Sequence, residues 1–290
     1  MNTQATTDLL RKVQQLAFRA RYISEHLLAG QYHSHFRGKG MTFSGLRKYQ
    51  FGDDVRAIDW NVTARYQEPH LKVFGEERAL NLLLLVDVSA SMHFGTTTQT
   101  KRGLAHELAA VLALAAHQND DQVGLVLFSN GIEHVVRPRK GYQHVLRLIR
   151  DMLDCQPVQQ QTNLTTALQF AMNMVRQKSI VCILSDFADT HYQPLLRLAA
   201  ARHQVIGMHL SDVREREIPN VGWLPVTDAE TGARAWLPTF LRGVRRHYQS
   251  LAAAQRTDTQ AIFKNSKADL LQVHTGEDYV DKLQKYFATR

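Results

Sequence analysis

The chain has 290 residues, of which 44% are hydrophobic, and its formal net charge is +8 at pH 7 with neutral histidines. This length allows one large domain or one domain with additions, and the apolar fraction is enough for a sizeable core. We expect no integral membrane segment, because no run of about 18 apolar residues is present. The N-terminus also lacks the basic start and apolar middle of a secretory signal, so we expect a cytoplasmic protein. Lysines and arginines are spread along the chain without interleaved aromatic residues, so no nucleic-acid partner is expected.

An amphipathic helix is expected over residues 7–30. Leu16, Ala20 and Ile23 belong to a single apolar face that recurs at three and four residues, and Gly30 can end the helix. Two interpretations remain open. The helix either docks on its own domain or binds a partner or a membrane surface.

Residues 31–79 change in character. Gly52, Asp53 and Asp54 form a turn signal, and further charges of both signs surround Trp60. We interpret this region as a local network of salt bridges and turns. A catalytic role for the two aspartates is an alternative, although no nucleophile or cofactor motif lies beside them. We therefore assign residues 1–79 to an N-terminal helix-plus-β extension and residues 80–290 to the main domain.

In the main domain, buried strands alternate with helices. Apolar runs predict strands over residues 82–86, 122–128, 180–186, 204–210 and 269–274, with a hairpin partner over residues 132–137. Helical patterns are expected at 101–117, 142–153, 161–177, 189–202, 239–256 and 277–287, with Asp189 as the cap of the fourth helix of this series. The alternation predicts an α/β fold with a doubly wound, mainly parallel sheet.

Residues 212–240 interrupt this alternation. Three prolines and a Thr-Gly turn suggest a hairpin insertion with strands at 222–226 and 233–237, which carry Trp223 and Trp236. The insertion is expected to be exposed. It is either a lid packed on its own sheet or a contact surface for a partner.

The strongest candidate for a functional site follows the strand at residues 82–86. Asp87, Ser89 and Ser91 form an Asp-x-Ser-x-Ser pattern that presents three oxygens on one side of an extended loop. Hard divalent cations take such oxygen ligands, and open α/β sheets bind ligands at this edge. The alternative is a Ser-rich turn that caps a helix. Thr162 and Asp186 are predicted to reach the same edge, because each lies in a loop near or just past a strand end.

These five residues resemble the metal-ion-dependent adhesion site of von Willebrand factor A-type domains. The resemblance implies that Asp87, Ser89, Ser91, Thr162 and Asp186 bind one divalent ion, normally Mg2+. Mn2+ is equally compatible with these ligands. Glycines often precede the threonine in that family, whereas glutamines precede it in this chain. The resemblance also implies an open coordination position that takes a carboxylate from a client protein.

A second resemblance concerns residues 37–65. Their Arg-Gly-x-Gly, Arg-x-Tyr-x-x-Gly-Asp-Asp-x-Arg-x-Ile-Asp-Trp and Ala-Arg segments resemble the signature of the bacterial family catalogued as domain of unknown function 58. Relatives in that family are commonly linked with MoxR-type AAA+ ATPases, with which they are thought to act as chaperone-like machines. The resemblance therefore implies a MoxR-type ATPase as a partner.

These observations predict a non-enzymatic, metal-dependent protein-binding module that acts as an adaptor or co-chaperone. A metal-dependent phosphoester hydrolase, with Asp53 and Asp54 near the metal, is the alternative, but the motif supplies no clear base or second metal. Nucleic-acid binding through the +8 charge is a third interpretation. Because the metal site is expected in surface loops, we also expect Asp87→Ala to leave the fold intact.

Overall fold

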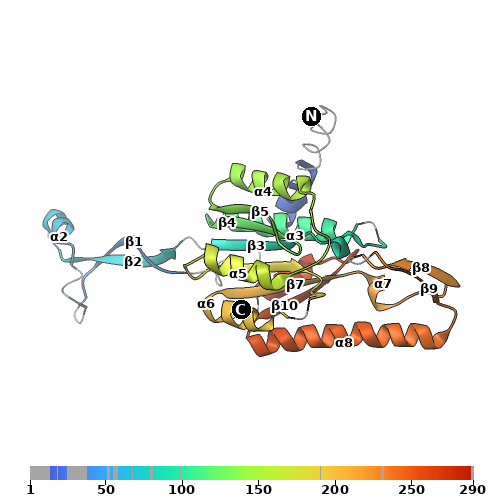
Figure 1. Ribbon diagram of the computed structural model, residues 1–290. Helices are drawn as coiled ribbons and strands as arrows, with labels where there is room; N and C mark the ends of the chain where they lie inside the picture. Colours follow the sequence, from blue (N-terminus) through green and yellow to red (C-terminus); the bar gives the residue numbers. More distant parts are fainter. Residues whose placement is uncertain are drawn as a thin grey trace. The chain divides into compact units, whose positions relative to one another are not determined.

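The computed structural model describes residues 14–17, 19–24, 38–50, 53–54, 58–66, 68–78, 81–97, 99–189, 191–229 and 232–288. The chain divides into two compact units (Figure 1). The small unit comprises residues 33–80, and the large unit comprises residues 1–32 together with 81–290. The large unit thus includes the described part of the N-terminal helix.

The small unit is a two-stranded sheet with a short helix. Strand β1 (Gly38–Lys48) pairs antiparallel with β2 (His70–Arg78), and α2 (Trp60–Tyr66) lies between them in sequence. The Arg47 guanidinium donates two hydrogen bonds of 2.7 and 2.6 Å to Asp53, which also accepts one of 2.9 Å from the Gln50 amide. These bonds hold the pKa of Asp53 below its usual value. Asp53 thus belongs to a local salt-bridge and turn network, as interpreted from the sequence.

The large unit contains a six-stranded sheet. Its strand order is β10-β7-β6-β3-β4-β5, and every neighbouring pair is parallel except β4 and β5. The strands are β3 (Asn81–Asp87), β4 (Gln122–Phe128), β5 (Ile132–Arg139), β6 (Ile180–Ser185), β7 (Gln204–Ser211) and β10 (Asp269–His274). The central strands are almost entirely apolar and buried, because helices cover both faces of the sheet. The predicted mainly parallel α/β fold is confirmed.

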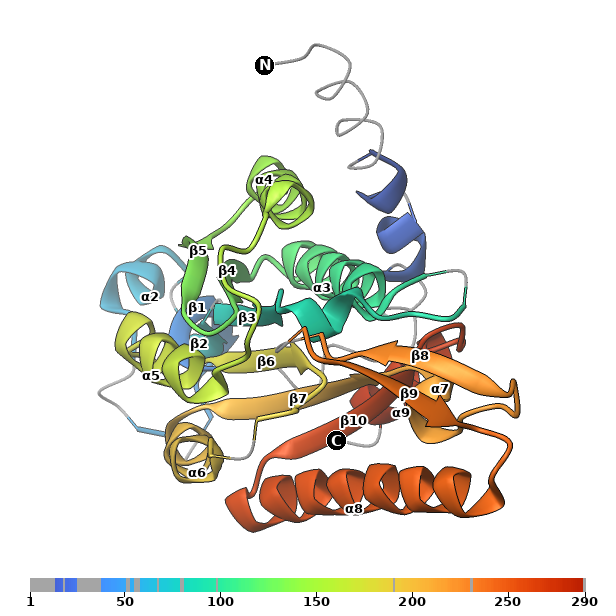
Figure 2. The ribbon, with the colours of Figure 1, turned by 45° about the vertical axis from the view of Figure 1, so that its right-hand side comes forward.

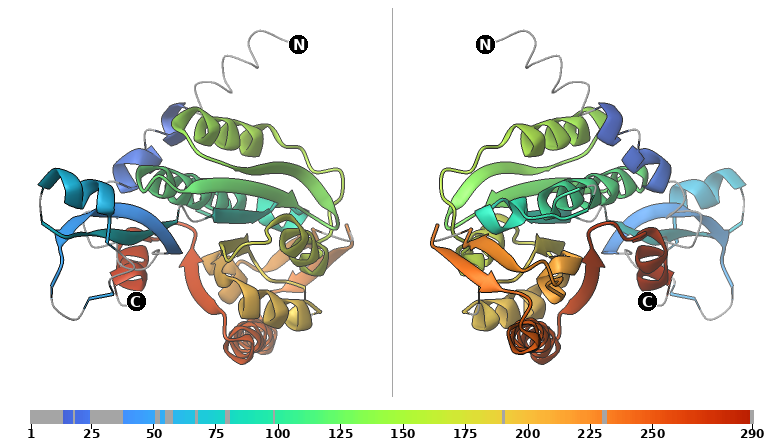
Figure 3. Two further views of the ribbon diagram at one scale, coloured as in Figure 1. Left: turned by 90° about the vertical axis from the view of Figure 1, so that its left-hand side faces the viewer. Right: turned by 90° about the vertical axis from the view of Figure 1, so that its right-hand side faces the viewer.

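Helices cover the two faces of this sheet (Figures 2 and 3). One face carries α3 (Lys101–Gln118) and α4 (Tyr142–Asp154). The other carries α5 (Leu164–Met174), α6 (Gln193–Arg202) and α8 (Arg242–Ser266), while α9 (Val280–Ala288) follows β10. A core cluster joins the sheet to α5 and α6 and to Phe263 of α8. Within the described part of the chain, no helix has both the length and the apolar character needed to cross a bilayer.

The described part of the N-terminal helix docks on its own unit. Ala20 and Ile23 are buried, as the apolar pattern predicts. Arg19 forms a 3.1 Å ion pair with Glu107 of α3, and Glu107 also accepts a 2.6 Å hydrogen bond from the Tyr279 hydroxyl. This face of the helix is therefore used within the molecule.

Several helix boundaries differ from the sequence-based expectation, among them both ends of α5 and the starts of α8 and α9. Two of the differences have a clear physical cause. Asp189 does not cap α6, which begins at Gln193; its carboxylate accepts a 3.1 Å hydrogen bond from the Leu164 amide at the start of α5. Helix α8 continues ten residues past the expected end, to Ser266. The polar residues in this stretch do not end it, because hydroxyls such as that of Thr259 bond to carbonyls four residues earlier. The helix ends where Lys267 adopts a φ of 57°.

The predicted hairpin insertion is present. Strands β8 (Trp223–Thr227) and β9 (Arg234–Pro238) form a separate two-stranded sheet between α7 (Val213–Arg216) and α8. Trp223 pairs with Pro238, and Pro225 pairs with Trp236, so both tryptophans lie on one face of the hairpin. They are 60% and 65% exposed. This face is open to solvent, so the hairpin is not a lid whose tryptophans pack on the main sheet.

Candidate metal centre

Asp87 ends β3 in the middle of the carboxyl edge of the sheet. One of its carboxylate oxygens accepts a 2.9 Å hydrogen bond from the Ser89 amide, and the other accepts a 2.6 Å bond from the Ser185 hydroxyl. The side chain is completely buried. The expectation that Asp87 lies in a surface loop is therefore wrong, because the carboxylate belongs to the end of a central strand covered by neighbouring strands.

The two serines of the motif lie in the loop that follows. Ser89 precedes a short 3-10 helix, η3 (Ala90–His93), but its side chain makes no capping hydrogen bond. The Ser89 and Ser91 hydroxyl oxygens are instead 3.2 Å apart. The next long helix, α3, is capped by Thr100, whose hydroxyl accepts a bond from Gly103. The helix-cap alternative thus does not account for the two serines.

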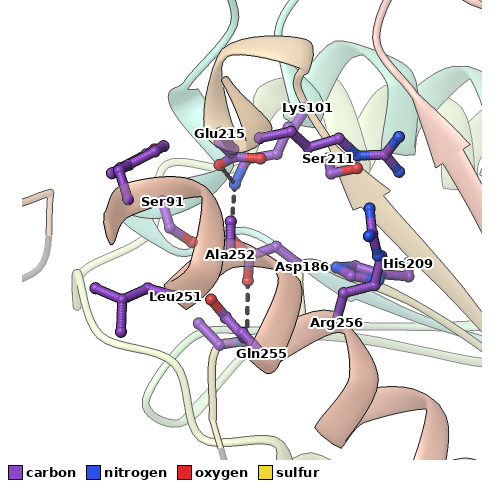
Figure 4. A pocket seen from close by; sticks show the side chains of 13 residues that line it. Ser91, Lys101, Asp186, His209, Ser211, Glu215, Leu251, Ala252, Gln255 and Arg256 are labelled. Carbon is purple, nitrogen blue, oxygen red and sulfur yellow. Dashed lines mark hydrogen bonds and ion pairs between the residues drawn. The ribbon is translucent and has the colours of Figure 1, made fainter. Parts of the chain in front are cut away.

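Asp186 follows β6, the neighbour of β3 in the sheet. Its carboxylate accepts a 2.7 Å hydrogen bond from the Lys101 ammonium and a 3.3 Å bond from the Ala188 amide. The same ammonium donates a 2.6 Å bond to Glu215 of α7 (Figure 4). The Lys101 side chain is only 2% exposed, so its charge is confined between these two carboxylates.

The loop that carries Thr162 also reaches this edge. The Ala90 amide donates a 2.9 Å hydrogen bond to the Gln160 carbonyl, which joins the Thr162 loop to the loop that follows β3. The Asn163 amide bonds at 2.8 Å to the carbonyl of Ser129, just after β4. Thr162 lies between these two anchored residues and is partly exposed. Glutamines in place of the usual glycines therefore still allow this loop to reach the sheet edge, and the Gln160 carbonyl even accepts one of the connecting hydrogen bonds.

The electrostatics of the two aspartates differ. Burial and the nearby charge of Asp186 raise the pKa of Asp87 to about 7, although hydrogen bonds from Ser185 and Ser89 act in the opposite direction. Burial also acts to raise the pKa of Asp186, but the charge and hydrogen bond of Lys101, assisted by Ser91, hold it below its ordinary value. The lysine therefore compensates one carboxylate, whereas Asp87 has only neutral donors.

The donor set fits a hard divalent cation. Two buried carboxylates meet hydroxyl groups at one edge of the sheet, and Asp87 has no cationic partner among the described residues. No group of three His, Cys, Asp or Glu side chains suited to a metal occurs among these residues. A softer ion that prefers nitrogen or sulfur is thus not favoured, while Mg2+ accepts few carboxylates and several neutral oxygens.

Comparisons with known proteins establish the family. The profile described as "Protein of unknown function DUF58" matches residues 45–258. The chain belongs to the DUF58 family. "Uncharacterized protein Rv1480" of Mycobacterium tuberculosis (strain ATCC 25618 / H37Rv) is 32% identical over 257 residues, which cover 87% of this chain and 80% of that protein.

Solved structures resemble this DUF58 protein at low sequence identity. An aerotolerance-related membrane protein from Bacteroides fragilis NCTC 9343, with multiple mutations to serines, matches 72% of this chain and 97% of its own with a TM-score of 0.51 and 14% identity. The SpRpn10 VWA domain matches 71% of this chain and 94% of its own with a TM-score of 0.38 and 13% identity. The first likeness concerns the fold alone.

Sequence reasoning missed Lys101 and Glu215 of the DUF58 protein. A lysine in the first turn of a helix is disfavoured by the helix dipole, and Lys101 is followed by a long buried helix. A lysine at this unfavourable position, at the start of a buried helix, is the local signal that its charge is paired within the protein. Glu215 carries no signal of its own, since it lies 114 residues away from Lys101 in the sequence.

Asp212 was also missed, although it organises the surroundings of Glu215. It caps α7 in a capping box, in which Glu215 bonds back to the Asp212 amide at 2.8 Å. The buried Asp212 carboxylate accepts bonds from the Thr96 amide and hydroxyl at 2.9 and 2.6 Å and from the Thr275 hydroxyl. Asp212 thereby connects three loops. It also positions Glu215, which accepts a hydrogen bond from the Lys101 ammonium.

We expect Asp212→Asn to destabilise the DUF58 protein at neutral pH by about 2 kcal/mol, because it removes charge-assisted hydrogen bonds. These bonds outweigh burial and lower the pKa of Asp212 from 3.8 to about 2. The stabilisation is complete above the ordinary pKa of 3.8, which applies to the unfolded chain. It is lost as the pH falls through the pKa of the folded protein, about 2. Urea unfolding of both proteins as a function of pH tests this. A constant difference between them down to the lowest pH would contradict it.

Proposed function

We propose that this DUF58 protein is a divalent-metal-dependent protein-binding module. Asp87, Ser89, Ser91, Thr162 and Asp186 would hold Mg2+ at the carboxyl edge of the sheet. The observation that carries the proposal is the convergence of two buried carboxylates, from two neighbouring strands, with hydroxyl groups. With few carboxylate ligands, the ion retains positive charge and can take a carboxylate from a partner protein.

The proposed module is not an enzyme. A hydrolase would need a general base or a second metal beside the first, and the hydroxyls and amides around Asp87 and Asp186 supply neither. The aspartate favoured by the hydrolase alternative, Asp53, is held by Arg47 within the small unit. We therefore assign the metal a role in binding.

We further propose that the partner is a MoxR-type AAA+ ATPase and that the protein acts as its adaptor or co-chaperone. Membership of the DUF58 family supports this partner, because the sequence resemblance implies the association. The client protein would then supply the carboxylate that completes the metal site.

A pull-down with this protein as bait tests the proposed function. We expect wild type in Mg2+ to capture an AAA+ ATPase or its client from a lysate of the source organism. EDTA or Asp87→Asn should remove the same proteins from the eluate. Asp120→Asn is the matched control, because this aspartate is exposed and forms only a surface ion pair with Lys140. Equal capture under all conditions would refute a metal-completed contact.

The hairpin provides a second prediction. We expect Trp223→Ala combined with Trp236→Ala to weaken capture of that partner at least tenfold, because exposed aromatic side chains are frequent anchors of protein interfaces. The unfolding free energy should change by less than about 1 kcal/mol, since both side chains are mostly in solvent. Capture assays and urea unfolding measure the two effects. Leu198→Ala, at another exposed apolar side chain outside the hairpin, is the control.

A further inference from the structure

A pocket of about 340 Å3 lies beside the candidate metal centre. It is bounded by the loops at the carboxyl ends of β6 and β7, by α7 and by α8 (Figure 4). Ser91 and Asp186 of the metal centre form part of its wall. A group bound in this pocket would therefore be adjacent to a ligand of the metal.

The pocket holds more positive than negative charge. Lys101, Arg216 and Arg256 line it, against the carboxylates of Asp186 and Glu215. Both carboxylates are already bound by Lys101. Lys101 balances one of these two negative charges, and with both arginines the pocket wall carries one excess positive charge.

Neither arginine has a carboxylate partner among the described residues. Arg216 donates to the His274 ring, and burial and the charge of Arg256 lower its pKa. The charge of Glu277 acts in the opposite direction, but Glu277 forms its ion pair with Lys282. Burial, together with neighbouring positive groups, lowers the pKa of His274 and of His209 to about 4, so both rings are neutral at pH 7. Two guanidinium groups close to each other, with neutral rings beside them, form a site with positive potential.

One wall of the pocket is formed by α8, the helix that also carries Arg256. Tyr248, Leu251 and Ala252 present aromatic and aliphatic carbon to the cavity. Leu251 is 56% exposed, so its apolar surface is available to a ligand that enters from solvent. The site thus combines two guanidinium groups that form no ion pair among the described residues with an apolar wall.

We propose that this pocket binds an acidic side chain of a protein partner, with Arg216 and Arg256 as its carboxylate-binding pair and α8 contacting an apolar neighbour of that residue. The proposal rests on the proposed function, because it adds a second recognition site beside the metal. A single carboxylate balances the one excess positive charge of the pocket wall. A phosphate dianion would leave an excess negative charge next to Asp186 and Glu215, so the carboxylate is favoured.

A peptide-binding experiment tests the proposal. The probe is a rhodamine-labelled, C-terminally amidated peptide, Gly-Leu-Glu-Leu-Glu-Gly, and its control is the same peptide with glutamine in place of glutamate. Fluorescence anisotropy in Mg2+ is expected to show binding of the glutamate peptide alone. Arg216→Gln and Arg256→Gln should each weaken it about tenfold or more, because each removes a charge-assisted contact. Arg246→Gln removes the same charge from an exposed position of α8 outside the pocket and should change the affinity less than twofold.

The outcomes separate this site from the metal site. If the metal-dependent function fails but the pocket is correct, the peptide still binds in EDTA and to Asp87→Asn, and binding is lost in the two arginine variants. The pocket proposal is overturned if wild type does not bind the glutamate peptide, if the glutamine peptide binds equally, or if Arg246→Gln weakens binding as strongly. Displacement of the peptide by an equal concentration of inorganic phosphate would also overturn the assignment to a protein carboxylate.

Discussion

Asp87→Asn is expected to abolish the stabilisation of this protein by Mg2+ while leaving the metal-free protein at least as stable as wild type. In the absence of metal, the Asp87 carboxylate is buried near the charge of Asp186, which is an unfavourable arrangement. Asparagine has nearly the same shape. Its carbonyl oxygen can still accept the bond from the Ser89 amide, and its NH2 group can donate to the Ser185 hydroxyl oxygen, so that the direction of the second bond is reversed. It removes the charge that the ion requires.

Thermal and urea unfolding in EDTA and in Mg2+ measure this effect. Wild type should gain about 2.7 kcal/mol at a Mg2+ concentration 100-fold above its Kd, whereas Asp87→Asn should gain none. Isothermal titration calorimetry with Mg2+ gives the binding directly. Asp120→Asn controls for the loss of one negative charge at the surface. A variant that still responds to Mg2+ would show that Asp87 is not a ligand.

Asp87→Ala is a harsher change than the sequence suggests. It leaves the Ser185 hydroxyl and the Ser89 amide without their acceptor in a buried site. It also opens a small cavity at the end of a central strand. Loss of function in that variant would therefore mix metal binding with stability, and asparagine is the sharper substitution.

Lys101→Met is expected to have two opposite effects. In EDTA it should destabilise the protein by about 3–5 kcal/mol, because it leaves the carboxylates of Asp186 and Glu215 without the cation that pairs them. In Mg2+ it should bind the ion at least tenfold more tightly. The lysine charge, 2.7 Å from a proposed metal ligand, repels an incoming cation, and its removal leaves a more negative site.

Urea unfolding in EDTA and calorimetric titration with Mg2+ separate the two effects. Lys140→Met is the matched control, because Lys140 forms an ion pair with the exposed Asp120, and its loss should cost less than about 1 kcal/mol. Weaker Mg2+ binding by a folded Lys101→Met protein would show that the lysine supports the metal site rather than competing with it.

Local sequence patterns were sufficient for most of the fold. Uninterrupted apolar runs such as 180–184 are typical of strands buried on both faces in a parallel sheet covered by helices. The Asn-Gly turn before β5 likewise determined its antiparallel pairing with β4. The hairpin at residues 223–238 was also predictable, because its prolines and turn residues interrupt the helical and strand periodicity.

Side-chain partners of polar residues were less predictable. Asp189 precedes a helix and has the residue type of a cap, yet it bonds to the start of α5 instead of α6. The helix expected to end at residue 256 continues as α8 to Ser266, and hydroxyls in its second half bond to carbonyls of the preceding turn. A polar side chain has several possible partners of similar energy, and the packing of the remaining chain selects among them.

The pairing of Asp87 with Asp186 at one edge of the sheet was predictable from local patterns. Both residues end apolar strands, and parallel strands bring such ends to the same edge. Three other features follow from long-range packing: Asp87 is buried, Lys101 lies between Asp186 and Glu215, and Arg216 and Arg256 line one pocket. These groups are far apart in sequence. Their contacts depend on how α3, α7 and α8 pack around the sheet edge, and no local propensity or periodicity encodes such contacts.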